Sequence, residues 1–167
     1  MLYLKELNWE DSEKEYEFFQ KMPSENGFVN EYQNITYETF MNAVIPSRIL
    51  ASKGIDLLEG YVPDSYYFLW YHQKIIGLYR IRHHLNAFLA QGPGHIGYGV
   101  LPDYRGLGYG TKGLAFAIDV CKRMIPENEI YMSCWKSNHA SLAIQIKNGA
   151  YIHHEDDQEY YTRIRIE

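Results

Sequence analysis

A glycine-rich turn between an apolar run and a helical pattern constrains this chain more than any other segment. Residues 96–101 are apolar or glycine apart from Tyr98, and Pro102 and Asp103 then break the run as a turn would. Residues 105–110 read RGLGYG, and helical apolar spacing begins behind them. Glycines let a backbone loop approach a ligand, and the first turn of a helix presents unpaired N–H groups. The segment therefore predicts a strand, an anion-binding turn and a helix, and a pyrophosphate is the simplest ligand for that turn.

Length and charge narrow the class of protein. The 167 residues are 46% hydrophobic and 22% charged, and we expect them to form one globular domain over residues 1–167. The formal net charge of -5 argues against a non-specific nucleic-acid surface and slightly favours a cationic small substrate. No run approaches ~18 apolar residues, and the acidic N-terminus lacks the apolar core of a signal peptide. We expect a cytoplasmic protein with neither nucleic acid nor membrane as a partner.

Cysteine and histidine spacing does not predict a metal site. Cys121 and Cys134 lack CxxC spacing, so reduced core thiols are expected. The histidine pairs at 83–84 and 153–154 have no further ligands at zinc-like spacing. Among the 16 tyrosines, those near the C-terminus make aromatic strands that are compatible with a homodimer.

Apolar periodicity predicts alternating blocks of strands and helices along the chain. Strands are expected at residues 2–7, 66–71, 75–82, 96–101, 130–135, 151–153 and 160–166. Helices are expected up to Met22, from Thr36 with Pro46 kinking or splitting it, behind the glycine turn, and from about Asn138 to Lys147. Residues 23–34, 54–64 and 86–94 are interpreted as loops. The helix behind the turn is expected to bury one stripe: Leu107, Leu114, Ile118, Cys121 and Ile125.

Several ligand classes compete for the glycine turn. Residues 108–113 are a literal GxGxxG, which is typical of a dinucleotide-binding fold. A Rossmann domain places that motif after its first strand, whereas here it comes late in the chain and hairpins flank it. A Walker A motif is absent, and a glycine-rich turn without any ligand is the further alternative.

The full pattern resembles the GNAT superfamily of acetyl-CoA-dependent N-acetyltransferases. Val100 is followed five residues later by Arg105-x-x-Gly108-x-Gly110, and Asn138-x-x-Ser141 opens the helix after the next strand. The motifs cover residues 66–154 and the element order covers the whole chain, while residues 82–86 and 94–98 look like a bacterial branch of predicted GNAT acetyltransferases. The resemblance implies an α/β (α+β) fold. Its central, mostly antiparallel sheet of six to seven strands splits between the strands at 96 and 130, with helices on both faces.

The resemblance also implies a binding mode for acetyl-CoA as co-substrate. Backbone amides of the turn wrap the pyrophosphate, and the residues concerned are Arg105, Gly106, Leu107, Gly108, Tyr109 and Gly110. Arg105 or Lys112 can add a full positive charge. The Val100 N–H holds the pantetheine, and the Tyr98 N–H donates to the thioester carbonyl and so stabilises the oxyanion. Asn138 and Ser141 lie near the cofactor arm, although Asn138 can equally be a plain helix N-cap.

The implied reaction is direct attack of a primary amine on the thioester in a ternary complex, and a group must accept the amine proton. His95 is the first candidate base. Strand alternation places it on the face opposite residues 96, 98 and 100, which favours a structural histidine, and Gly94 stands where some relatives carry a catalytic glutamate. Substrate contacts are expected from the end of the preceding strand and its loop: Arg82, His83, His84 and Asn86.

The chain departs from the family at Gln145. Many GNAT enzymes carry there a tyrosine that protonates the departing CoA thiolate, although a thiol with a pKa near ~8.5 needs little help. Tyr151 or Tyr160 can substitute, and a core role is the alternative for each. The resulting prediction is an N-acetyltransferase with an unidentified acceptor, a small amine or amino-acid derivative being slightly favoured over a protein. The competing hypothesis is a non-catalytic acyl-CoA-binding or sensing module.

Overall fold

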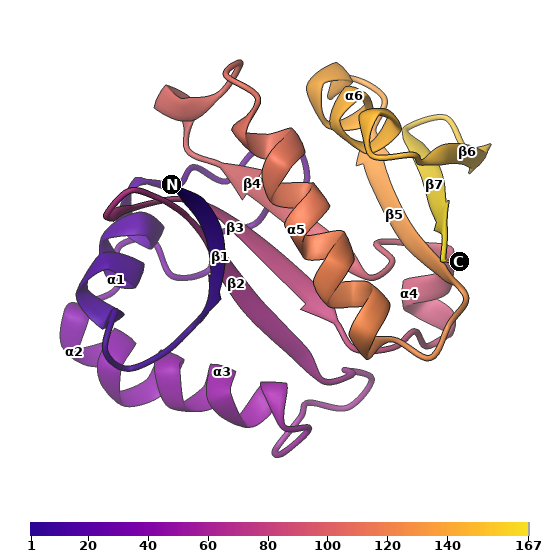
Figure 1. Ribbon diagram of the computed structural model, residues 1–167. Coiled ribbons are helices and arrows are strands. Elements are labelled where there is room, and N and C mark those ends of the chain that lie inside the picture. The colour runs from indigo at the N-terminus through magenta and orange to yellow at the C-terminus, as the bar shows by residue number, and fades with distance from the viewer. Residues whose placement is uncertain (167) are drawn as a thin grey trace.

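The chain forms two antiparallel sheets that meet at one point (Figure 1). The structure is a computed structural model and describes residues 1–166. The larger sheet has the order β1-β2-β3-β4, with β1 at Leu2–Glu6, β2 at Asp64–Tyr71, β3 at Lys74–Arg82 and β4 at Ile96–Val100. The smaller sheet has the order β5-β7-β6, with β5 at Glu129–Trp135, β6 at Tyr151–Glu155 and β7 at Glu159–Arg165. Seven antiparallel strands divided between β4 and β5 confirm the expected architecture.

The contact between the two sheets is short and lies at the start of β4. Gly94 and Met132 form an isolated bridge, and the His95 N–H donates to the Tyr131 carbonyl at 2.7 Å. The Tyr131 N–H in turn donates to His95 Nδ1 at 2.9 Å. Beyond these bonds β4 and β5 belong to separate sheets, so the edge of β4 that faces β5 is left without a strand partner along the rest of its length.

Helices cover both faces of the larger sheet. The helical segments are α1 Ser12–Lys21, α2 Tyr37–Thr39, the π-helical turn Phe40–Val44, α3 Ile45–Ser52, α4 Ala87–Gln91, the 3-10 turn Pro102–Tyr104, α5 Tyr109–Met124 and α6 His139–Lys147. Phe18, Phe19 and Phe40 form one core with Phe68 on the α1–α3 face. A second core lies under α5, where Leu114 and other α5 residues pack on the opposite face of the sheet. Figure 1 shows α5 running across the front of the larger sheet, close to where β5 begins.

Two local expectations need correction, and one is confirmed. Leu107 is 63% exposed because it lies in the turn before α5 rather than in the helix, whereas Leu114, Ile118 and Cys121 are buried as expected. The stretch 86–94 is not wholly a loop, because the Asn86 side chain caps the short helix α4. The helical stretch around Pro46 is interrupted as expected, since the π-helical turn ends at Val44 and α3 begins at Ile45, directly before Pro46.

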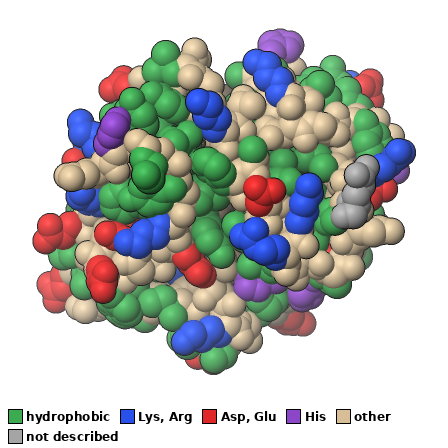
Figure 2. Space-filling model, in the orientation of Figure 1, with side chains coloured by type: hydrophobic (Ala, Val, Ile, Leu, Met, Phe, Trp, Pro, Cys, Tyr) green, Lys and Arg blue, Asp and Glu red, His purple; other side chains and the backbone are tan. Residues whose placement is uncertain are grey.

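Charged side chains of both signs lie on the face of the molecule that Figure 2 shows. Figure 2 shows basic and acidic side chains interspersed over the face that α5 covers. Within residues 1–166, no helix combines the length and the apolar character needed to cross a membrane.

Candidate active site

The glycine turn leads into α5 without a side-chain cap. Gly106 and Gly108 have φ values of 76° and 86°, in the left-handed region that favours glycine. A Cβ at either position would meet nothing within 4 Å, so backbone conformation rather than crowding selects glycine there. Gly108 is the N-cap of α5 and offers no side chain to the first turn, whose N–H groups therefore receive no side-chain cap. This geometry suits an anionic ligand.

Gly110, the third glycine of the turn, has a different structural role. A Cβ on Gly110 would stand 2.9 Å from Ile144 Cδ1 on α6, so its missing side chain lets α5 approach α6. The Tyr79 hydroxyl donates to the Gly110 carbonyl at 2.9 Å and fixes the start of α5 to β3. The sequence interpretation gave the three glycines one shared role. The structure instead divides them into two that shape the turn and one that packs it.

Arg105 braces the turn against the end of β4. Its Nε donates to the Val100 carbonyl at 2.8 Å, and its guanidinium pairs with Glu25 from the segment that follows α1. The guanidinium therefore already has a carboxylate partner in this structure.

Backbone groups on β4 point alternately to β3 and to the opening between the sheets. The Arg82 N–H donates to the His95 carbonyl, and the Leu101 N–H donates to the Ile76 carbonyl. Odd-numbered positions of β4 thus pair with β3, and alternation turns the N–H groups of Tyr98 and Val100 toward the unpaired edge. These are the two amides for which the family resemblance implied contacts with acetyl-CoA, and they lie where a second extended chain can bind.

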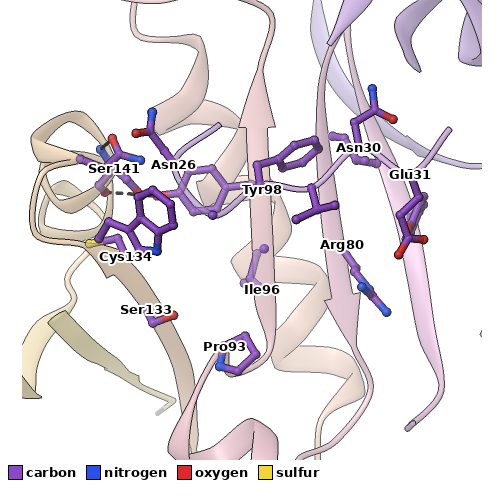
Figure 3. Close-up of a pocket in the computed structure, with 18 of the residues that line it drawn as sticks. Asn26, Asn30, Glu31, Arg80, Pro93, Ile96, Tyr98, Ser133, Cys134 and Ser141 are labelled. Atoms are coloured by element: carbon purple, nitrogen blue, oxygen red, sulfur yellow. Dashed lines mark hydrogen bonds between the residues drawn. The ribbon is translucent and has the colours of Figure 1, made fainter. Parts of the chain in front are cut away.

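A cavity of about 400 Å³ adjoins this edge, on the side of the sheet where α1 and residues 26–32 lie. Figure 3 shows its residues running from Ser133 and Cys134 on β5, past Tyr98 and Ile96 on β4, to Arg80 on β3. Gly97 also lines it, and a Cβ there would enter empty space. Asn138 and Ser141 close the end next to α6. The cavity thus begins beside the free edge of β4 and extends toward the middle of the larger sheet.

The Tyr98 side chain lies within a polar network at the opening. Its hydroxyl is 2.7 Å from Ser141 Oγ and 3.1 Å from the Ser141 carbonyl, as the dashed lines in Figure 3 indicate. Burial raises the pKa of Tyr98 to about 12, so the phenol keeps its proton at neutral pH. Sequence reasoning used only the backbone of this residue and missed the side chain.

Gln145, which stands where many relatives carry a tyrosine, is fully buried behind Tyr98. Its carbonyl oxygen accepts from the Thr162 hydroxyl at 2.7 Å, and its amide nitrogen lies 3.4 Å from the Tyr98 hydroxyl. Asn138 accepts from the Ser141 N–H at 3.2 Å and caps α6. The capping role of Asn138 is therefore present together with its place on the cavity wall.

The chain belongs to a known family. A family model described as the acetyltransferase (GNAT) family matches residues 30–144, which include the glycine turn, most of the cavity lining and most of α6. This protein is a member of the GNAT acetyltransferase family. No curated protein matches the chain in sequence.

Solved structures of GNAT proteins share the fold over nearly the whole chain. A GNAT-family acetyltransferase from Streptococcus pneumoniae has a TM-score of 0.67 at 15% identity, with 100% of both chains covered. The ribosomal-protein-S5-alanine acetyltransferase from Vibrio fischeri has a TM-score of 0.69 at 14% identity, covering 98% of this chain and 92% of that one. The Campylobacter jejuni N-acetyltransferase PseH, solved with acetyl coenzyme A, has a TM-score of 0.58 at 17% identity and 99% coverage of both.

The His95 side chain is part of the buried framework of the fold and does not line the cavity. Its side chain is fully buried, Nδ1 accepts from Tyr131 N–H, and Nε2 lies 2.8 Å from Glu127 Oε1. Because Nδ1 is an acceptor, the ring is neutral and Nε2 donates. Burial lowers its pKa against the opposing effect of Glu127. Both ring nitrogens are occupied, and the residue is not among those that line the cavity.

Of the four residues predicted to contact substrate, Arg82 lines the cavity. His83 Nε2 lies 2.8 Å from Ser65 Oγ, and His84 Nδ1 lies 3.3 Å from the Leu85 carbonyl. Asn86 caps α4 and donates to the Gly60 carbonyl at 2.9 Å. The structure therefore brings one of the four to the cavity and gives the other three local partners outside its lining.

A second arginine on the cavity wall was missed from the sequence. Arg80 lines the cavity two residues before Arg82, while Ile81 between them is buried under α5. Asp64 is 3% exposed and pairs with both Arg80 and Arg48. The alternation of arginine with isoleucine at 80–82 was the available signal, because residues i and i+2 of a strand share one face.

Proposed function

We propose that this GNAT protein transfers an acetyl group from acetyl-CoA to a primary amine of a small acceptor. The observation that carries the proposal is the opening between β4 and β5. It presents unpaired β4 amides beside a cavity, and the same strand leads directly to the uncapped start of α5. The acetyl-CoA complex of the Campylobacter jejuni structure, which has the same fold, supports the choice of donor.

Each part of the donor site has a role in this reaction. The amides of the turn and the first turn of α5 bind the pyrophosphate, helped by the partial positive charge of the helix terminus. The Val100 N–H holds the pantetheine arm at the free edge of β4. The Tyr98 N–H donates to the thioester oxygen, which gains negative charge as the amine attacks the carbonyl carbon. Arg105 supports the turn through Val100 and Glu25.

The Tyr98 hydroxyl is the side chain that we assign to the leaving group. As the C–S bond breaks, its electron pair stays on sulfur, and a hydrogen bond from a phenol stabilises the developing thiolate. A phenol with a pKa near 12 keeps its own proton, so Tyr98 acts as a donor without being consumed. Ser141 and Gln145 orient the hydroxyl. Gln145 thus supports a tyrosine from β4 where many relatives place a tyrosine on the helix.

The amine proton leaves toward a group on the cavity wall. Glu31 and Glu159 are the carboxylate residues that line the cavity, and either accepts the proton directly or through water. Cys134 also lines the cavity, but burial raises the pKa of its thiol to about 11, so it stays protonated. His95 takes no part in this step, because its Nδ1 already accepts a backbone hydrogen bond.

The second candidate function is an acyl-CoA-binding module without turnover, and Gln145 is the observation in its favour. An amine panel incubated with acetyl-CoA and monitored for free thiol separates the two functions. The acetyltransferase proposal expects saturable, amine-dependent thiol release with formation of the N-acetyl product. Tight acetyl-CoA binding without thiol release across the panel supports the binding module and contradicts the enzyme.

A further inference from the structure

The charge on the cavity wall differs from the charge of the whole chain. The chain carries a net -5, yet the end of the cavity at β3 is formed by Arg80 and Arg82. Behind them, Asp64 is shared between Arg80 and Arg48. One carboxylate therefore pairs with two of the three guanidinium groups, and the cluster keeps an excess of positive charge.

Arg82 is the member of the cluster without a carboxylate partner. Its Nη1 donates to the Gly94 carbonyl at 3.1 Å, and within residues 1–166 no carboxylate oxygen lies within ion-pair distance of it. Burial, followed by repulsion from Arg80, lowers its pKa to about 10. A partly buried guanidinium that still needs an anion is costly for the free protein, and a bound anion reverses that cost.

The two carboxylates that line the same cavity do not neutralise Arg82. Glu31 is exposed and belongs to the segment after α1. Glu159 stands on β7 across the opening, where its Oε2 accepts from the Tyr161 hydroxyl at 3.2 Å. Positive charge thus collects at the β3 end of the cavity and negative charge at other parts of its wall. That separation suits a small molecule with an amine at one end and an anion at the other.

We propose that the acceptor amine carries an anionic group, a carboxylate or a phosphate, which Arg82 binds with help from Arg80. The inference rests on the proposed acetyl transfer for the role of the amine, but the anion site is argued from the cavity alone. Guanidinium groups recognise both kinds of oxyanion through paired N–H donors. The cavity of about 400 Å³ is of a size that holds a small ligand beside the end of the pantetheine arm. Aromatic side chains of Phe19, Phe28 and Tyr66 line its apolar side.

Pairs of amines that differ only in the anion test the proposal. L-phenylalanine is compared with 2-phenylethylamine, L-lysine with cadaverine, and glucosamine 6-phosphate with glucosamine. Kd is measured by calorimetry in the presence of CoA, and kcat/KM by thiol release from acetyl-CoA. We expect the anionic member of at least one pair to bind about tenfold more tightly or better, as expected for a charge-assisted contact. The carboxylate and phosphate arms identify which anion the site accepts.

The variant Arg82→Gln carries the second half of the test. It is expected to remove the preference for the anionic member, so that the Kd values of the two members of a pair come within about twofold of each other, because the change removes one charge-assisted contact. Comparing both members on the same variant cancels differences in amine basicity. Arg123→Gln is the matched control, since Arg123 is exposed on α5 away from this cavity and should change nothing. Thermal unfolding verifies that both variants fold.

The outcomes separate this inference from the proposed function. Anion-selective binding that needs Arg82 but gives no thiol release supports the anion site and contradicts acetyl transfer. Equal or better acetylation of the neutral members supports acetyl transfer and overturns the anion site. Absence of binding by every anionic member, or an anion preference that survives in Arg82→Gln, also overturns it.

Discussion

The donor end and the acceptor end of this site are built by different means. The donor end consists of backbone: two glycines with positive φ, the uncapped start of α5 and the free amides of β4. The acceptor end consists of side chains from distant segments, with Arg80 and Arg82 on β3 facing residues 26–32 and β5. A short sequence motif determines local backbone geometry, whereas the residues of a cavity wall are brought together by the tertiary fold. A family motif therefore identifies the donor but leaves the acceptor open.

The largest expected effect at the donor end comes from Gly108→Val. A β-branched residue resists a φ of 86°, so the turn must change shape and lose its amide geometry. We expect acetyl-CoA binding to weaken on the order of 100-fold, equal to about 2.7 kcal/mol. Calorimetry with acetyl-CoA measures the loss.

Gly60→Val is the matched control for that change. Gly60 has a φ of 83°, and a Cβ there also meets nothing within 4 Å, but it lies in the loop before β2. Both variants should lose a similar part of their unfolding free energy, and only Gly108→Val should lose acetyl-CoA. Equal affinity in the two folded variants would contradict the assignment of the turn.

Tyr98→Phe tests the point where donor and acceptor ends meet. Removing the hydroxyl deletes the hydrogen bond that we assign to the departing thiolate, and kcat is expected to fall about tenfold with the KM for acetyl-CoA little changed. Tyr151→Phe is the control, since the Tyr151 hydroxyl donates to Glu129 at 2.6 Å outside the cavity. A turnover rate that is unchanged in Tyr98→Phe, or reduced in Tyr151→Phe, contradicts the assignment.

His95→Asn is expected to affect stability rather than catalysis. The asparagine oxygen can replace Nδ1 as acceptor for Tyr131 N–H, but the bond to Glu127 is lost, at a cost of about 1–2 kcal/mol at neutral pH. The folded pKa of His95 lies below its unfolded value, so protonation of the unfolded chain destabilises the wild type as pH falls below about 6.5. The deficit of the variant should therefore shrink as denaturant titrations are carried to more acidic pH. If turnover instead fell by about two orders of magnitude in a folded variant, the proton-accepting role would belong to His95.

The smallest effect concerns Glu15 on α1, remote from either end of the site. Glu15 is 1% exposed, and burial raises its pKa to about 8 while the Asn8 N–H donates to its carboxylate at 3.1 Å. The folded protein thus binds a proton that the unfolded chain releases above about pH 4.5, and stability declines as pH rises from there to about 8. Glu15→Gln should remove this decline and raise the unfolding free energy by about 1 kcal/mol near pH 8. Parallel curves of unfolding free energy against pH for wild type and variant across that range would contradict the raised pKa of Glu15.

The sequence predicted those parts of the fold that depend on local sequence pattern. The seven strands and the turn before α5 follow from alternation, glycine placement and helical spacing, whereas the split between β4 and β5 was implied by the family resemblance. Leu107 was misplaced because helical spacing does not mark the residue at which a helix begins. The short helix α4 was missed because its five residues lie within a glycine-rich stretch.

The acceptor side was beyond sequence reasoning for a physical reason. Arg80 and Asp64 are 16 residues apart, and their pairing depends on the register of β2 with β3. The Tyr98 hydroxyl meets Gln145 from an element 47 residues away. His83 and His84 were attractive because of their residue type, yet local partners bind both. Which side chains enter a cavity is decided by the packing of elements that no short motif encodes.

Acetyl transfer itself is best tested by thiol release from acetyl-CoA, followed together with mass spectrometry of the amine, over a range of both substrates. We predict a rate that saturates in acetyl-CoA and in an anionic amine, with one acetyl group appearing on the amine for each thiol released. Thiol release that does not depend on the amine, or acetyl-CoA binding with no release for any amine, would contradict the transfer reaction.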